Sequence, residues 1–122
     1  MNIHVAVSQW MTDKLYKEIR SLDNVFDVVE RVFLISRDQI KTKSRQGDII
    51  EARHAFIYVA REVMKYPLIS IGSEMGMDHT SIMSAVESFK GRLVSDYRGI
   101  NRKMKALYHI AFEGETVGTY TL

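Results

Sequence analysis

Residues 67–91 read PLISIGSEMGMDHTSIMSAVESFKG, and this stretch decides the fold. Pro67 suits the first position of a short helix, because the N–H that proline lacks would have no partner there. Gly76 is a natural end for that helix, and Asp78 is a natural N-cap for the next helix, predicted over 79–91. A short helix, a tight turn containing glycine and a second helix together predict a helix-turn-helix.

The two faces of the predicted helix 79–91 differ in chemistry. One face is apolar and carries Ile82, Val86, Phe89 and Leu93, with Met83 and Ala85 beside them. The other face carries small hydroxyl residues, namely Ser81, Ser84 and Ser88, with Thr80 next to them at the N-terminal end. A merely solvated face would favour Lys, Glu and Gln, which have better helix propensity. Small hydroxyl side chains instead let the backbone approach another surface, as a recognition helix in a DNA major groove requires.

Asp78 and His79 also raise the question of a metal or catalytic site. Being adjacent, they point about 100° apart on a helix, and no His or acid follows four residues later. Ser81 would face away from His79, which argues against a catalytic dyad. The remaining alternative is structural, with Asp78 only capping the helix and His79 only covering the turn. We therefore predict no metal ligand set, no cofactor site and no enzyme activity.

The composition favours a single all-α domain. The chain has 122 residues, of which 46% are hydrophobic and 26% charged, and its single Pro and seven Gly are too few for the turns of a sandwich or barrel. No apolar run approaches about 18 residues, and the N-terminus does not resemble a signal peptide. A cytoplasmic protein without membrane contact is therefore expected. Cys is absent, which excludes disulfides and thiol catalysis.

Further helices are predicted on both sides of the motif. Residues 8–20 form a first, weakly amphipathic helix, and Asp23 caps a second helix with apolar residues at helical spacing. Asp48 caps a long helix over 49–66, which is apolar on most of its circumference and therefore central. Its polar stripe consists of His54, Tyr58, Arg61 and Lys65. A final helix runs from about 93 to 110.

These helices define the expected domain organisation. The folded domain spans residues 23–110, an N-terminal extension covers 1–22, and a loosely ordered tail covers 111–122.

Charge is unevenly distributed along the chain. Residues 37–65 carry seven Lys and Arg against four acids, a net +3, and residues 90–105 carry six against one, a net +5. The segment 66–89 between them is at −3. Two basic blocks around the predicted motif indicate a polyanion as partner, and the alternative is that these are only the solvated faces of charged helices.

The motif matches a known family. ISIGSEMGMDHTSIMSAVESF, residues 69–89, resembles the signature I-G-x-x-F-G-x-R-D-H-T-T-V-x-x-A-x-x-x-I of the DNA-binding C-terminal domain of the DnaA replication initiators. KTKSRQGDIIEARHAFIYVAREVMKYPL, residues 41–68, resembles the basic loop and long helix of the same domain, and the resemblance covers about residues 23–108. It implies a compact all-α domain with a helix-turn-helix, as in Trp repressor and DnaA domain IV, that binds a nonamer of duplex DNA, the DnaA box.

Carried over by position, the resemblance implies roles for ten residues. Those that would read base edges in the major groove are Asp78, His79, Thr80 and Ser81. Arg45, in the basic loop, would enter the adjacent minor groove. Those that would hold the phosphate backbone are Arg53, His54, Arg61, Leu68 and Ile69. The chemistry fits, because Asp accepts from the amino group of cytosine, Thr packs on the thymine methyl, and Arg suits a narrow minor groove.

The sequence also departs from the family pattern. The turn between Gly76 and Asp78 is one residue shorter, and Met77 stands where the family has an Arg. Met75 replaces the family Phe, Ser81 replaces the second Thr, and VESF replaces a segment with a basic residue, so that Glu87 would border phosphates. No G-x-x-x-x-G-K-[ST] motif for nucleotide binding occurs in the 122 residues. We therefore expect a free-standing box-reading domain, not an initiator by itself.

The expected function is sequence-specific binding of double-stranded DNA by a small transcriptional or replication regulator that acts at DnaA-box-like sites in the nucleoid. The alternative is a protein-interaction module that retains the fold and binds a replication protein. Salt-dependent binding to duplex DNA separates the two. Residues 1–20, with Trp10 and Leu15, are the expected place for a homodimer contact, unless Trp10 packs in the core.

Overall fold

The computed structural model describes residues 21–111, among which no strand occurs, so the all-α prediction is confirmed. The elements in chain order are α2 (Leu22–Phe33), α3 (Arg37–Ile40), α4 (Gly47–Tyr58), the π-helical turn η1 (Val59–Val63), α5 (Leu68–Met75), α6 (His79–Ser95), the 3-10 turn η2 (Tyr97–Gly99) and α7 (Ile100–Ala111). The predicted helix over 8–20, with its expected dimer contact, lies outside the described residues. The predicted tail, 111–122, lies outside them as well, except for Ala111, which is the last residue of α7. Within residues 21–111 no helix has the length and apolarity that a membrane span needs.

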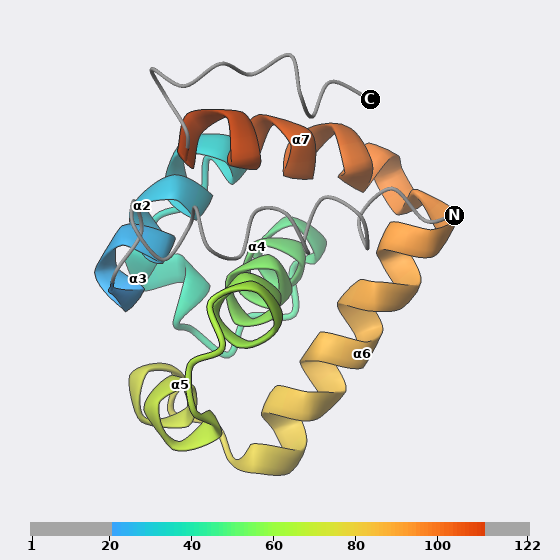
Figure 1. The fold of residues 1–122 in the computed structure, drawn as a ribbon. Helices are drawn as coiled ribbons and strands as arrows, with labels where there is room; N and C mark the ends of the chain where they lie inside the picture. The colour runs from blue at the N-terminus through green and yellow to red at the C-terminus, as the bar shows by residue number, and fades with distance from the viewer. Residues whose placement is uncertain (1–20, 112–122) are drawn as a thin grey trace.

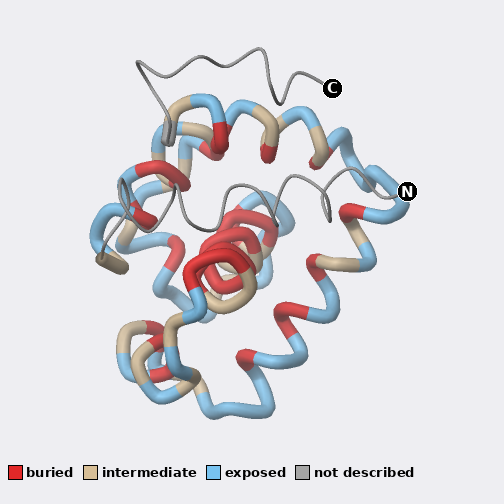
Figure 2. The backbone as a smooth tube through the Cα atoms, viewed as in Figure 1, coloured by how far each residue is buried: buried red, intermediate tan, exposed pale blue. Residues whose placement is uncertain are grey.

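The helix predicted to be central, α4, does lie in the middle of the domain (Figure 1). It packs against α2 and α6, and α7 covers α2. Phe56 of α4 stacks on Phe26 of α2 with ring centroids 3.8 Å apart, and Tyr58 contacts Phe89 of α6 with centroids 5.1 Å apart. Tyr58 is therefore buried, and its placement in a polar stripe was wrong. Figure 2 shows buried residues concentrated on α4 and along one side of α6, so the core fixes the orientation of α6.

Two predicted N-caps are wrong, because each aspartate pairs with a distant arginine. The N-cap of α2 is Ser21, whose hydroxyl accepts from the Asn24 N–H at 3.3 Å, while Asp23 pairs with Arg37 at 2.5 Å. α4 begins after Gln46, two residues before the predicted start. Asp48 lies in its first turn, with Oδ1 2.8 Å from Nη2 of Arg98.

The long helix predicted over 49–66 changes its winding near its end. In η1 the N–H of Met64 bonds to the carbonyl of Val59 at 2.9 Å, an i to i+5 bond that is typical of a π-helical turn. The helix stops at Lys65, which has a left-handed backbone with φ of 62°. The wider turn therefore sets the direction in which the chain leaves for α5.

The helices at the C-terminal side also differ from their predicted bounds. α6 extends to Ser95, four residues beyond the predicted end, and stops where Asp96 adopts a left-handed conformation with φ of 51°. α7 starts only at Ile100, after the turn η2, in which Arg98 and Gly99 are also left-handed.

The predicted helix-turn-helix is formed by α5 and α6. Pro67 is the N-cap of α5, one residue before its predicted place. Gly76 ends α5 in the left-handed region with φ of 64°, as predicted. The N–H groups of Gly76 and Met77 both bond to the carbonyl of Gly72, which closes the turn before the N-cap Asp78.

Gly72 is the residue that leaves room for this short turn. A Cβ at position 72 would lie 2.6 Å from the carbonyl oxygen of Met77, so the backbone would have to shift. Gly72→Ala is therefore expected to lower the free energy of unfolding by at least about 1 kcal/mol. The matched control is Gly91→Ala within α6, where nothing lies near the added Cβ. This control should raise the free energy of unfolding by about 0.5–1 kcal/mol. Urea unfolding measures both changes, and equal stability of Gly72→Ala and the unaltered protein would contradict the steric argument.

Candidate nucleic-acid interface

The start of α6 presents the four residues that the sequence assigned to base reading. Asp78 is the N-cap, and its Oδ1 accepts from the N–H of Ser81 at 2.7 Å. This hydrogen bond is the main cause that lowers the pKa of Asp78, which keeps the carboxylate ionised. His79, Thr80 and Ser81 are exposed. The prediction that Asp78 caps α6 is confirmed. The first turn of α6 is therefore both capped and exposed to solvent.

The two faces of α6 are as predicted. The buried residues of α6 are Ile82, Ala85, Val86, Phe89 and Leu93, and the hydroxyl residues Ser84 and Ser88 are exposed. Met83, predicted beside the apolar face, is 37% exposed. The core contacts of α6 thus come from one side, which leaves the hydroxyl side free for a ligand.

A groove brings the basic loop and the start of α6 together. Its volume is about 510 Å³, and its lining includes Lys41, Thr42, Lys43, Ser44, Arg45, Arg53, His54, Asp78 and Ser81. Five of the ten residues assigned by the resemblance therefore line one hollow, although they come from the loop, α4 and α6. Lys43 and Arg45 are exposed there, and within residues 21–111 neither forms an ion pair.

Arg53 lines this groove and holds the loop through bonds to the loop's backbone carbonyls. Its Nε donates to the carbonyl of Ile40 at 3.1 Å, and its Nη2 donates to the carbonyls of Thr42 and Ser44, the latter at 3.0 Å. Burial lowers the pKa of Arg53 from its ordinary value, but a guanidinium remains charged in proteins. Arg53 is thus half-buried, cationic and bonded to the loop.

His54 is a neutral imidazole at the wall of the groove. Burial, followed by the positive charges of Arg92 and Arg53, lowers the pKa of His54 to about 4. Its Nδ1 is buried without a hydrogen-bond partner among the described residues. At pH 7 this side chain therefore carries no charge.

The lowered pKa of His54 predicts a pH dependence of stability. Below pH about 6.5 the unfolded chain binds a proton at this residue that the folded protein takes up only near pH 4. The free energy of unfolding should therefore fall as the pH drops from about 6.5 to about 4, and His54 should contribute nothing above that window. Urea unfolding of the unaltered protein and of His54→Gln at pH 7 and pH 5 measures the loss of unfolding free energy that is due to His54. An identical loss of stability in both proteins would contradict the prediction.

Arg61, Leu68 and Ile69 gather at the N-terminus of α5. Nη1 of Arg61 donates to the carbonyl of Tyr66 at 3.0 Å, which places the guanidinium beside the residues that start α5. Ile69 is 70% exposed and shares a hollow of about 460 Å³ with His79 and Asp78. The first amides of a helix have no partner within the helix. This end of α5 therefore offers N–H donors close to the start of α6.

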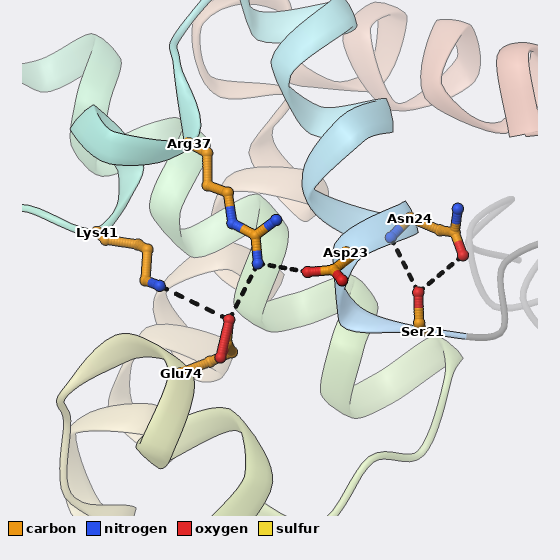
Figure 3. Close-up of polar contacts among 6 residues, drawn as sticks. All are labelled: Ser21, Asp23, Asn24, Arg37, Lys41 and Glu74. Atoms are coloured by element: carbon orange, nitrogen blue, oxygen red, sulfur yellow. Dashed lines mark hydrogen bonds and ion pairs between the residues drawn. The ribbon is translucent and has the colours of Figure 1, made fainter.

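An ion-pair network that the sequence did not predict fixes the loop to α5 (Figure 3). Nη2 of Arg37 contacts Asp23 of α2 and, at 3.1 Å, Glu74 of α5, and Nζ of Lys41 lies 3.6 Å from the same Glu74. The Arg37 guanidinium also lies 4.3 Å from the ring centroid of Phe26. The network joins three helices at the point where the basic loop begins. Helix α3 begins with a capping box formed by Ser36 and Gln39, and their S-x-x-Q spacing is the local signal that could have identified it.

Three of the six cations of the second basic block, 90–105, pair with acids of the described residues. Lys90 pairs with Glu62 at 2.6 Å and lies 3.6 Å from Glu87, and Arg98 pairs with Asp48. Lys103 pairs at 2.8 Å with Glu51, whose side chain is buried in α4. Nothing in the sequence marked Glu51 as buried. Lys43 and Arg45 in the groove, which form no ion pair among the described residues, are therefore better placed for a polyanion than these three paired cations.

Comparisons with known proteins show which family the chain resembles. The family model described as the bacterial DnaA protein helix-turn-helix matches residues 22–88. The chromosomal replication initiator protein DnaA of Nautilia profundicola is 33% identical over 92 residues, which are 75% of this chain and 21% of that protein. The DnaA of Helicobacter hepaticus is 34% identical over 89 residues, which are 70% of this chain and 20% of that protein. No solved structure gives a significant match.

The matched segment includes all of the predicted interface. Residues 22–88 run from α2 into the second half of α6. They contain the helix-turn-helix, the groove beside the basic loop and the hollow beside Ile69. The chain spans about a fifth of the length of the curated relatives it matches. The resemblance seen in residues 41–89 is thereby confirmed, and the chain belongs to the family of the bacterial DnaA protein helix-turn-helix.

Proposed function

We propose that this chain binds double-stranded DNA sequence-specifically at sites that resemble the DnaA box. In this proposal α6 enters the major groove and the loop 41–46 follows the adjacent minor groove. The observation that supports it best is the groove in which Arg45 of the loop meets Asp78 and Ser81 of α6. A basic loop beside an exposed helix start matches the side-by-side arrangement of the two grooves of a duplex.

Base reading falls to the first turn of α6. A carboxylate accepts several hydrogen bonds, so Asp78 can cap α6 and also accept from the amino group of a cytosine. His79 and Thr80 follow it on the exposed side of the helix. Ser81 offers a hydroxyl but lacks the methyl group with which a threonine would contact thymine.

Phosphate binding falls to the residues on both sides of α6. Arg53 and His54 line the groove next to the loop, and Arg61 lies at the start of α5. Leu68 and Ile69 have apolar side chains, so their contribution would come from the backbone N–H groups at the N-terminus of α5. Such N–H groups, together with the helix dipole, favour an anion.

The protein would act as a small regulator of transcription or replication at the nucleoid. Support comes from its family and from relatives that are named chromosomal replication initiator proteins. If this protein binds DnaA-box-like sites, it would compete for them with such initiators.

Selection from random duplex DNA with the full chain tests the proposal. The enriched sequences should resemble a DnaA box and should tolerate change at the position read by Ser81. No enrichment of any duplex would contradict the proposal. If the chain instead formed a complex with a replication protein, the interaction module would be the better explanation.

A further inference from the structure

The loop 41–46 has little apolar packing of its own. Its neighbours Ile40 and Ile49 are buried, but all of its residues except Ser44 are exposed. Short side-chain bonds link it locally: the N–H of Ser44 donates to Oγ1 of Thr42 at 3.3 Å, and the N–H of Gln46 donates to Oγ of Ser44 at 3.2 Å. Such bonds shape single turns, but they do not attach the loop to the domain.

At the start of the loop Lys41 lies 3.6 Å from Glu74 of α5, and Arg53 attaches the rest of the loop. Three of its five N–H groups go to three carbonyls at alternate residues, Ile40, Thr42 and Ser44, along the loop and its entry. A guanidinium is planar and holds its donors in a fixed fork, so three bonds to one segment determine the course of that segment. The two N–H groups on Nη1 have no hydrogen-bond partner among the described residues, so binding a phosphate and holding the loop are compatible.

We propose that Arg53 is a positioning residue that orders the loop 41–46 and thereby presents Arg45 to the minor groove. This role rests on the proposed function and goes beyond a phosphate contact. A loop that is ordered before binding loses less conformational entropy when DNA arrives. The preference of Arg45 for a narrow, A·T-rich minor groove would then depend on Arg53, a residue that does not itself read a base.

Arg53→Lys separates the two roles, because lysine keeps the charge but cannot bridge three carbonyls. The first measurement is amide hydrogen exchange of the full chain without DNA. We expect the amides of Ser44 and Gln46 to exchange at least about tenfold faster in Arg53→Lys, while the core amides of α4 keep their protection. Unchanged exchange in the loop would overturn the proposal whether or not the protein binds DNA.

The second measurement compares affinity for one selected site with an A·T-rich flank and with a G·C-rich flank. The unaltered protein should prefer the A·T-rich flank on the order of fivefold, the low end for one altered base contact. Arg53→Lys should abolish this preference as Arg45→Ala does, and the double variant should lose no more than either. The matched control is Arg61→Lys, which should change affinity equally on both flanks.

Each outcome of this comparison decides the role of Arg53. A flank preference that survives in Arg53→Lys would overturn the proposal, even if loop exchange were faster. Additive effects would also overturn it: Arg53→Lys and Arg45→Ala would each lower the flank preference in part, and the double variant would lower it further. Absence of any DNA binding by the unaltered protein would contradict the proposed function instead, and loop exchange would then decide whether Arg53 orders the loop.

Discussion

Raising the NaCl concentration from about 50 to about 200 mM should weaken binding to duplex DNA several hundredfold at pH 7. Besides Lys41, which pairs with Glu74, the cations near the groove and the start of α5 are Lys43, Arg45, Arg53, Arg61 and Lys65. About five phosphate contacts give a slope of roughly −4 to −5 in a plot of log affinity against log salt concentration. His54 adds nothing to this slope, because its lowered pKa keeps it neutral at pH 7.

Gel shifts or fluorescence anisotropy over a salt series measure the slope. Lys43→Ala should reduce its magnitude by about 1, since it removes one phosphate contact. Arg31→Ala is the matched control, because Arg31 is an exposed cation of α2 that does not line the groove. A flat salt response of the unaltered protein would remove DNA binding as its function.

The parts of the fold that could be predicted are those that local chemistry decides. Gly76 ends α5 because glycine adopts the left-handed conformation without strain. Asp78 starts α6 because its carboxylate reaches the N–H three residues later. The apolar circumference of α4 required burial on nearly all sides, which only a central position provides.

The two wrong N-cap predictions share a physical cause, competition from residues far away in the sequence. Asp23 and Asp48 both had the chemistry of an N-cap, but Arg37 and Arg98 bind their carboxylates. Arg37 is 14 residues from Asp23 and Arg98 is 50 residues from Asp48, so no local pattern reveals either pair. Asp78 forms no ion pair among the described residues and remains a cap.

The identity of the proposed interface residues could be predicted from the sequence, but their contacts within the domain could not. The ten residues came from a resemblance that is carried by position, and the groove brings five of them together. The internal bonds of Arg53 could not be predicted, because they depend on the path of the loop. Nor could the sequence show that Arg37 and Lys41, which count as positive charge, share Glu74 within the domain.

His79→Ala should remove most of the discrimination between a selected site and unrelated duplex DNA. The loss of a base contact costs about 1–3 kcal/mol of discrimination, which is a factor of about 5 to 150 in relative affinity. Nonspecific binding should persist, because the cations proposed to bind phosphate are unchanged. Stability should change little, because His79 is exposed at the first position of α6. Competition binding with selected and scrambled duplexes measures the discrimination.

Position 79 tests base reading more cleanly than position 78, because Asp78 has a second task. Asp78→Ala would remove the N-cap bond to Ser81 as well as a base contact, at a cost of about 1 kcal/mol in stability. Asp78→Asn keeps the capping oxygen and removes the charge, so it should preserve stability while weakening the preference for cytosine. Val94→Ala, at the far end of the same helix and 76% exposed in the unaltered protein, is the control and should keep full discrimination. If His79→Ala keeps it too, the start of α6 only caps and covers the turn, and site selection must come from the loop.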